Sequence, residues 1–190
     1  MRLQTLMFLG GIALVAAVGY AFITADDVPK AAQRAKAVWG SVETEFRNRA
    51  EFADTIIATI AQINPGQTEL VDKVKSAQTA VLALKPDATA PADITHFRSF
   101  MKVQDALSAN LGLVMDMLRL YPDKARTDGV AKTFAELELK ESHIVVARSD
   151  YVELAGAHNN LLKALPQSWV AAFFHPDARP LVASFDPAKQ

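Results

Sequence analysis

Three side chains on one predicted helix are the best candidates for chemistry: Glu141, Arg148 and His158. They fall on an otherwise apolar stripe of residues 130–165, whose members follow one another in steps of three or four and therefore share one helix face. A carboxylate, a guanidinium and an imidazole are groups that serve acid–base catalysis or the binding of ions. On a face that packs inward each charge is costly unless it is paired, so partners must come from a neighbouring element.

A second predicted helix, residues 29–63, carries one charge on its own apolar stripe, Arg49. In an up-and-down bundle this helix runs antiparallel to residues 130–165. Arg49 lies about 30 Å from the start of its helix at roughly 1.5 Å per residue, and the same distance back from residue 165 falls between Glu141 and Arg148. We predict a buried charge cluster in which Glu141 pairs with Arg49, Arg148 lies close by, and the helix register is fixed. The alternative is that the helices slide by one turn and each charge reaches solvent separately.

No catalytic or metal-binding pattern accompanies these residues. The chain has no cysteine, which removes disulfides, thiolate metal sites and cysteine nucleophiles together. Helical di-iron sites need Glu-x-x-His pairs, and Gly-rich phosphate loops, His-Glu-x-x-His and nucleophile elbows are equally missing from the sequence. His158 is better interpreted as a core histidine with a hydrogen-bond partner than as a ligand. We predict a non-enzymatic protein with no catalytic residues, no metal site and no cofactor.

The composition is that of a globular domain with an added hydrophobic segment. Of 190 residues, 51% are apolar and 22% are charged, which excludes a disordered chain and leaves room for one domain of ordinary size. The formal net charge is -1 at pH 7. Basic residues are dispersed without interleaved aromatics, so nucleic acid is excluded as a partner.

Residues 6–23 (LMFLGGIALVAAVGYAFI) contain no charged side chain. This run reaches the lower end of the length that spans a hydrocarbon core, and we interpret residues 1–27 as an uncleaved transmembrane anchor. A cleaved signal peptide is the alternative. Against it, the apolar run is longer than the usual hydrophobic region of a signal peptide, and Ile23-Thr24-Ala25 is a poor cleavage site.

The charges that flank this run bear on its orientation. Arg2 precedes it, and Asp26 and Asp27 follow it, which favours a cytoplasmic amino terminus. The positive-inside rule counts basic residues over a longer window, and this inference is weakened by three that follow the run: Lys30, Arg34 and Lys36. We expect a single-pass protein of a bacterial-type inner membrane whose bundle leans towards the periplasm.

Four amphipathic helices are predicted after the anchor. The first ends at the breaker Asn64-Pro65-Gly66, the second is shorter, Asp93 is the expected N-cap of the third, and Pro166 closes the fourth. No alternating strand pattern occurs, and each apolar stripe must be buried against another helix. The predicted fold is all-α: an antiparallel four-helix bundle of long helices (28–175) behind an N-terminal transmembrane helix (1–27), with an extended C-terminal tail (176–190).

The segment after Pro166 is rich in aromatic residues and short of charge. By topology it returns to the membrane end of the bundle. Trp169, Phe173 and Phe174 are therefore predicted to lie in the membrane interface or to contact a partner, because amphipathic aromatics are favoured there. The alternative is that these rings cap the open end of the bundle core.

Several blocks of the sequence resemble the LemA family. They are Trp39 with Arg49, Tyr121-Pro122-Asp123, Glu141, Ile144, Ala147-Arg148, Tyr151, Asn159, Pro166, Ala171 and Phe174. Val152, His158, Leu165 and His175 depart from the family pattern, so the chain is similar to a divergent member. The resemblance implies an amino-terminal membrane helix and an all-helical body, and it supplies no catalytic residues. Relatives have been predicted to carry the body on the cytoplasmic side, against the orientation that the flanking charges favour.

Two functions fit these features. The first is a membrane-anchored, non-enzymatic helical bundle that acts as a scaffold or interaction module of the cell envelope. Its partners would be the membrane, other membrane or envelope proteins, and copies of itself. The second is a lipid- or small-molecule-binding envelope sensor that uses a crevice of the bundle. A scaffold predicts an exposed apolar patch on the bundle exterior, and a sensor predicts a pocket.

Overall fold

The computed structural model describes residues 19–20, 24–186 and 188, and this part of the chain is all-helical without strands. Most of the predicted anchor, including residues 6–18 and 21–23, lies outside the described residues. Among the helices that the structure does describe, none is both long enough and apolar enough to cross a membrane.

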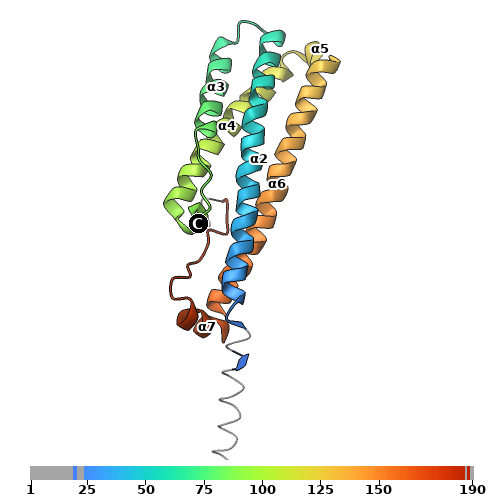
Figure 1. Ribbon diagram of the computed structural model, residues 1–190. Coiled ribbons are helices and arrows are strands. Elements are labelled where there is room, and N and C mark those ends of the chain that lie inside the picture. The colour runs from blue at the N-terminus through green and yellow to red at the C-terminus, as the bar shows by residue number, and fades with distance from the viewer. Residues whose placement is uncertain (1–18, 21–23, 187, 189–190) are drawn as a thin grey trace, which may run out of the picture.

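Four long helices alternate in direction along the molecule (Figure 1). They are α2 (Asp27–Ile63), α3 (Thr68–Leu82), α4 (Ile94–Arg119) and α6 (Asp128–Lys163). Three short elements complete the chain: the 3-10 turn η1 (Ala90–Ala92), α5 (Pro122–Ala125) and α7 (Gln167–Phe174). The four helices predicted after the anchor are therefore present, and η1, α5 and α7 are additional elements.

The helix ends follow the local signals in the sequence. α2 begins at Asp27, ahead of the expected start at Pro29, because proline is tolerated in the first turn of a helix. Asp93 caps α4, and its Oδ1 accepts from the backbone N–H groups of Thr95 and His96 at 2.8 and 3.2 Å. These hydrogen bonds hold the pKa of the Asp93 carboxyl below its usual value. The N-cap predicted from the sequence is thus confirmed.

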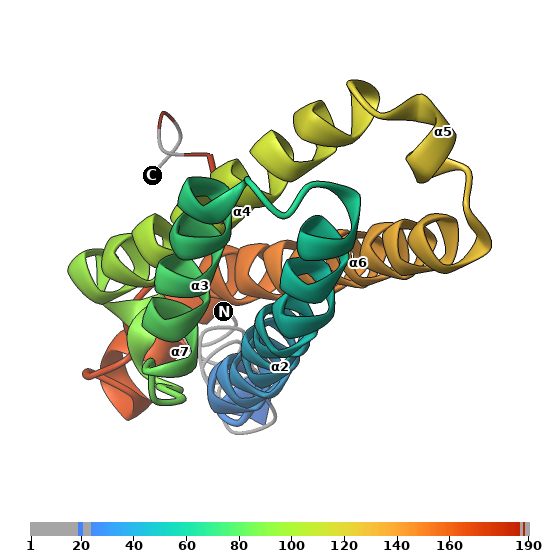
Figure 2. The same cartoon turned by 90° about the horizontal axis from the view of Figure 1, so that it is seen from above.

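The helices do not surround one another evenly. α2 packs along α6 and also against α3, while α4 packs mainly on α3. Viewed from above, α2 lies between α3 and α6 (Figure 2). α3 has 15 residues against 37 in α2 and 36 in α6, so it covers only the half of the bundle that is remote from α7. The other half is completed by the loop before α4 and by the C-terminal segment (Figure 1).

The hydrophobic core is divided into two clusters along the bundle axis. The cluster remote from α7 joins α2, α3, α4 and α6 through residues such as Ile56, Val74 and Leu107. The cluster nearer α7 is built around Trp39, Phe97 and Tyr151. Arg49 belongs to neither apolar cluster, and its position on α2 lies between them in sequence. The part of the bundle around Arg49, where the sequence predicted a charge cluster, is thus a polar layer between two apolar clusters.

Candidate functional site

The polar layer is organised by Arg49, whose side chain is only 1% exposed. Its Nη1 donates to Oε1 of Glu141 at 3.0 Å and to Oγ of Ser108 at 2.7 Å. Its Nη2 donates to the backbone oxygen and to Oε1 of Gln104 at 3.3 and 3.4 Å. The guanidinium also lies 5.2 Å from the ring centroid of Phe46. Three helices therefore meet at one buried cation.

The structure brings Arg49 and Glu141 together, but it does not bury both. The Glu141 side chain is 43% exposed, so water shares its charge. Arg148 lies near the pair without bonding to Glu141, and its guanidinium carbon sits 4.3 Å from the ring centroid of Phe185. Burial lowers the pKa of Arg148, as does Arg49, while Asp105 and Glu141 oppose this shift. The layer holds helices in register and opens on one side to solvent.

A segment that the sequence did not indicate as part of the site is the strap, defined as residues 179–185. Asn159 of α6 forms a pair of hydrogen bonds with the backbone of Leu181: Nδ2 donates to its oxygen and Oδ1 accepts from its N–H, both at 2.8 Å. The Tyr151 hydroxyl donates to the oxygen of Val182 at 2.7 Å. The N–H of Val182 donates in turn to the oxygen of Pro91, also at 2.7 Å. The strap is thus bonded on both sides, to α6 and to η1.

The strap ends in an aromatic cluster beneath it. Phe185 lies against the rings of Trp39, Phe97 and Tyr151, at centroid distances of 6.4, 5.3 and 5.8 Å. Burial raises the pKa of Tyr151, so its hydroxyl remains a hydrogen-bond donor at neutral pH. Residues 176–186 of the predicted tail form no helix, and they are part of the body, with Leu181 buried in the core.

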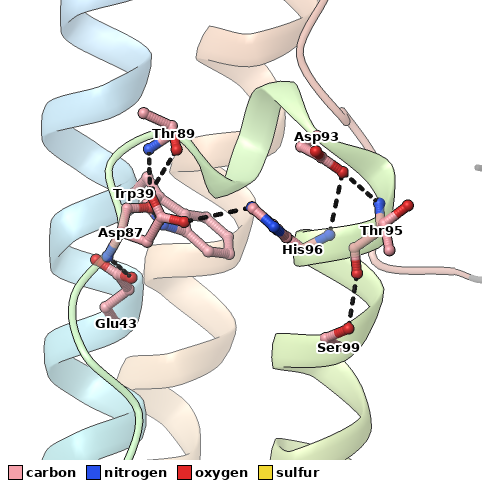
Figure 3. Close-up of polar contacts among 8 residues, drawn as sticks. All are labelled: Trp39, Glu43, Asp87, Thr89, Asp93, Thr95, His96 and Ser99. Atoms are coloured by element: carbon pink, nitrogen blue, oxygen red, sulfur yellow. Dashed lines mark hydrogen bonds and ion pairs between the residues drawn. The ribbon is translucent and has the colours of Figure 1, made fainter.

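The loop before α4 is fixed by polar contacts that hold η1 in place (Figure 3). The indole N–H of Trp39 donates to the backbone oxygen of Asp87 at 3.1 Å, and Glu43 Oε1 accepts from the N–H of Asp87 at 2.9 Å. The Asp87 carboxylate accepts from Thr89 and lies 3.6 Å from Nδ1 of His96. Thr89 and His96 hold the pKa of Asp87 below its usual value, whereas burial raises that of Glu43.

α7 presents its aromatic side chains to solvent. Val170 and Ala171 are buried against the body, whereas Trp169 is 71% exposed and Phe173 is 81% exposed. Phe174 is exposed to a lesser degree. Trp169 and Phe173 therefore do not cap the end of the core, which the sequence allowed as an alternative.

α7 also contacts the chain just before α2. Gln167 Nε2 donates to the hydroxyl of Tyr20 at 2.8 Å, and His175 Nε2 donates to the backbone oxygen of Ala25 at 2.6 Å. The exposed aromatic face thus lies at the end of the body where the apolar run of residues 6–23 joins it.

A cavity of about 400 Å³ opens beside α7. Its walls are the first turns of α2, the carboxyl end of α6 and the segment that joins α7 to the strap: Val28, Pro29, Ala32, Lys36, Ala92, His158, Phe174, His175, Pro176, Asp177, Ala178, Arg179 and Leu181. His158 is 1% exposed, and its Nε2 donates to the backbone oxygen of Arg179 at 3.0 Å. This is the core histidine with a partner that the sequence led us to expect.

Comparison with known proteins gives one family. The LemA family sequence model matches residues 38–190, which is most of the chain. The chain belongs to the LemA family. No curated protein matches the sequence.

The LemA match covers the strap as well as the helices. Three residues on which the resemblance rests, Arg148, Tyr151 and Asn159, all contact the strap. In this LemA-family chain those residues therefore hold the C-terminal segment against the body.

Sequence reasoning missed the strap, although signals for it existed. Tyr151 and Asn159 place polar groups on or beside an inward stripe, where they need partners, and Leu181, Val182 and Phe185 make the tail too apolar for a solvated end. Of the predicted site residues, Arg49 and Glu141 are brought together, and Arg148 points to the strap. Trp169, Phe173 and Phe174 lie apart from them on α7.

Proposed function

We propose that this LemA-family chain is a membrane-anchored, non-enzymatic scaffold or interaction module of the cell envelope. The observation that supports it best is the aromatic face of α7, on which Trp169 and Phe173 are exposed. The two ends of this helix are bonded, through Gln167 and His175, to the chain just before α2. Large apolar side chains that remain exposed on a monomer commonly mark a membrane or partner surface. The membrane is the occupant we assign to this face, because the apolar run of residues 6–23 leads directly to it.

The non-enzymatic part of the proposal is supported by the use that the fold makes of its polar groups. Arg49 is surrounded by acceptors from Ser108, Gln104 and Glu141. Tyr151 and Asn159 are bonded to the strap backbone. Each of these groups holds two segments of the chain together. Their polar atoms therefore serve the fold, which supports a structural role and not a catalytic one.

Spin labels on introduced cysteines test the position of α7, because the chain has no cysteine of its own. We expect a label at Phe173→Cys, in the full chain reconstituted in phospholipid nanodiscs, to relax more strongly with oxygen than with a water-soluble nickel chelate. The reason is that oxygen concentrates in the membrane, whereas the chelate stays in water. Electron paramagnetic resonance power saturation measures both.

The matched control is Leu139→Cys, another exposed apolar residue, which lies far along α6 from α7. Its label is expected to favour the nickel chelate. Equal accessibility profiles at residues 139 and 173 would show that α7 lies in water.

The proposed periplasmic location of the bundle rests on the charges that flank residues 6–23. It is tested by treating spheroplasts with an impermeant maleimide, which labels Leu139→Cys only if the bundle lies on the periplasmic side.

A binding sensor is the second candidate, and the cavity beside α7 favours it. Its volume of about 400 Å³ is within the range of small-molecule sites. Cross-linking in intact membranes separates the two functions. A scaffold, whose partners are other envelope proteins or further copies of this chain, gives discrete cross-linked species, and a sensor acting alone gives none.

A further inference from the structure

We infer that the cavity beside α7 binds a phosphodiester that carries a free hydroxyl, the chemistry of a glycerol-type phospholipid headgroup. The inference rests on the proposed membrane position of α7 for the source of the ligand, and on the cavity itself for the ligand's chemistry. Three separate observations support it: the charges that line the cavity, an unpartnered polar atom of His158, and the position of the apolar lining residues.

The charges that line the cavity favour a monoanion. Lys36 comes from α2 and Arg179 from the strap, and neither forms a salt bridge within the described residues. Asp177 is the carboxylate on the same wall. Two cations and one anion leave one positive charge when His158 and His175 are neutral. A phosphodiester carries one negative charge and therefore balances it.

His158 supplies the second observation. Its Nε2 donates to the oxygen of Arg179 at 3.0 Å, so the neutral ring has its lone pair on Nδ1. That Nδ1 is buried and has no hydrogen-bond partner. A buried acceptor without a donor is costly. His158 lines the cavity, so a ligand hydroxyl that enters beside its ring would supply the missing donor, and a choline headgroup, which has no O–H group, would not.

One apolar wall of the cavity lies on the side nearer residues 6–23. Val28, Pro29 and Ala32 occupy the first turns of α2, and Phe174 ends α7. Lys36 is about 12 Å further along α2 from Val28, at roughly 1.5 Å per residue. An amphiphile would therefore place its phosphate near Lys36 and Arg179 and direct its acyl chains along Val28 and Phe174 towards the membrane.

Titration of the full chain in a neutral detergent with dihexanoyl phosphatidylglycerol tests the site. Binding is followed by the imidazole nitrogen resonance that disappears in His158→Gln. We expect saturable binding, and about tenfold or greater weakening in Lys36→Gln and in Arg179→Gln, because each removes a charge-assisted hydrogen bond. Lys132→Gln, at an exposed lysine on α6 remote from the cavity, is expected to bind unchanged.

Further probes separate the sources of the ligand. Dihexanoyl phosphatidylcholine is expected to bind at least tenfold more weakly, since it has no free hydroxyl and no net charge. If glycerol 1-phosphate or inorganic phosphate binds as tightly as the glycerol lipid, the ligand is a soluble phosphate and the lipid assignment is wrong. Equal binding by Lys36→Gln, Arg179→Gln and the unchanged chain overturns the site itself.

The test is independent of the proposed position of α7. The double variant Trp169→Ser and Phe173→Ser removes the exposed rings without touching the cations of the cavity. It is expected to bind the short-chain lipid as the unchanged chain does, even if α7 lies outside the membrane. Loss of binding in this variant would place the lipid on α7 instead of in the cavity.

Discussion

Glu141→Gln is expected to lower the free energy of unfolding by about 2 kcal/mol, because a charge-assisted hydrogen bond to a buried guanidinium becomes a weaker one to a neutral acceptor. The substitution keeps the shape of the side chain and removes its charge. Arg49 would then keep its guanidinium at 1% exposure with only neutral acceptors, from Ser108, from Gln104 and from the amide oxygen introduced at position 141. Chemical denaturation followed by circular dichroism measures the change. The half-exposed Glu141 keeps the effect below that of a fully buried pair, roughly 3–5 kcal/mol.

Glu138→Gln is the matched control, because Glu138 lies on the same helix and is exposed. Surface substitutions of this kind usually change stability by less than about 0.5 kcal/mol. In an Arg49→Met background the cost of Glu141→Gln is expected to vanish, because the cation that pairs with Glu141 is absent. Ser108 keeps a partner in this background, since it can still donate to the oxygen of Gln104. A double-mutant cycle isolates the pairwise energy. Equal losses for Glu141→Gln and Glu138→Gln would contradict a stabilising role for the pair.

The Arg49–Glu141 pairing is also the part of the structure that the sequence predicted most directly. Helix rise is a constant, so distance along a helix can be counted from residue numbers alone. Pro29 and Pro166 fixed the start of α2 and the end of α6 closely enough for that count to hold. The extent of burial was not predictable in this way, because it depends on how α4 and α6 approach each other around Glu141.

The strap could not be predicted by the same reasoning. Its contacts run from side chains of α6 to its own backbone, as in the hydrogen-bond pair of Asn159 with Leu181, and backbone groups carry no sequence signal. Periodicity identifies helix faces, and residues 179–185 have no periodicity. The sequence predicted that the second helix is shorter, but the completion of the other half of the bundle by the strap was hidden for the same reason.

α7 illustrates an intermediate case. The sequence identified its aromatic residues and the end of the bundle at which they lie, but left open whether they face the core. The structure decides this by burying Val170 and Ala171 and exposing Trp169 and Phe173. A segment of 8 residues is too short for its hydrophobic pattern to indicate which face packs inward.

Phe185→Ala is expected to lower the free energy of unfolding by about 2 kcal/mol, less than the roughly 3–5 kcal/mol of a fully buried phenylalanine because this ring is half-buried. The ring contacts Trp39, Phe97 and Tyr151 and lies under the guanidinium of Arg148. Its removal loosens the strap and admits water to the aromatic cluster. Trp39 is fully buried in the unchanged protein, and its fluorescence emission should shift to longer wavelength. The emission is measured in a Trp169→Phe background, where Trp39 is the single tryptophan.

Phe173→Ala provides the matched control, since it makes the same substitution at a ring that is 81% exposed. In detergent it is expected to change stability by less than about 0.5 kcal/mol and to leave the Trp39 emission unchanged. If Phe185→Ala behaves in the same way, the strap is held by its hydrogen bonds, such as those to Tyr151 and Asn159, and not by this ring. If only Phe185→Ala exposes Trp39, the C-terminal segment contributes to the stability of the core. The cavity wall that Arg179 and Leu181 form then depends on the packing of the Phe185 ring, several residues further along the chain.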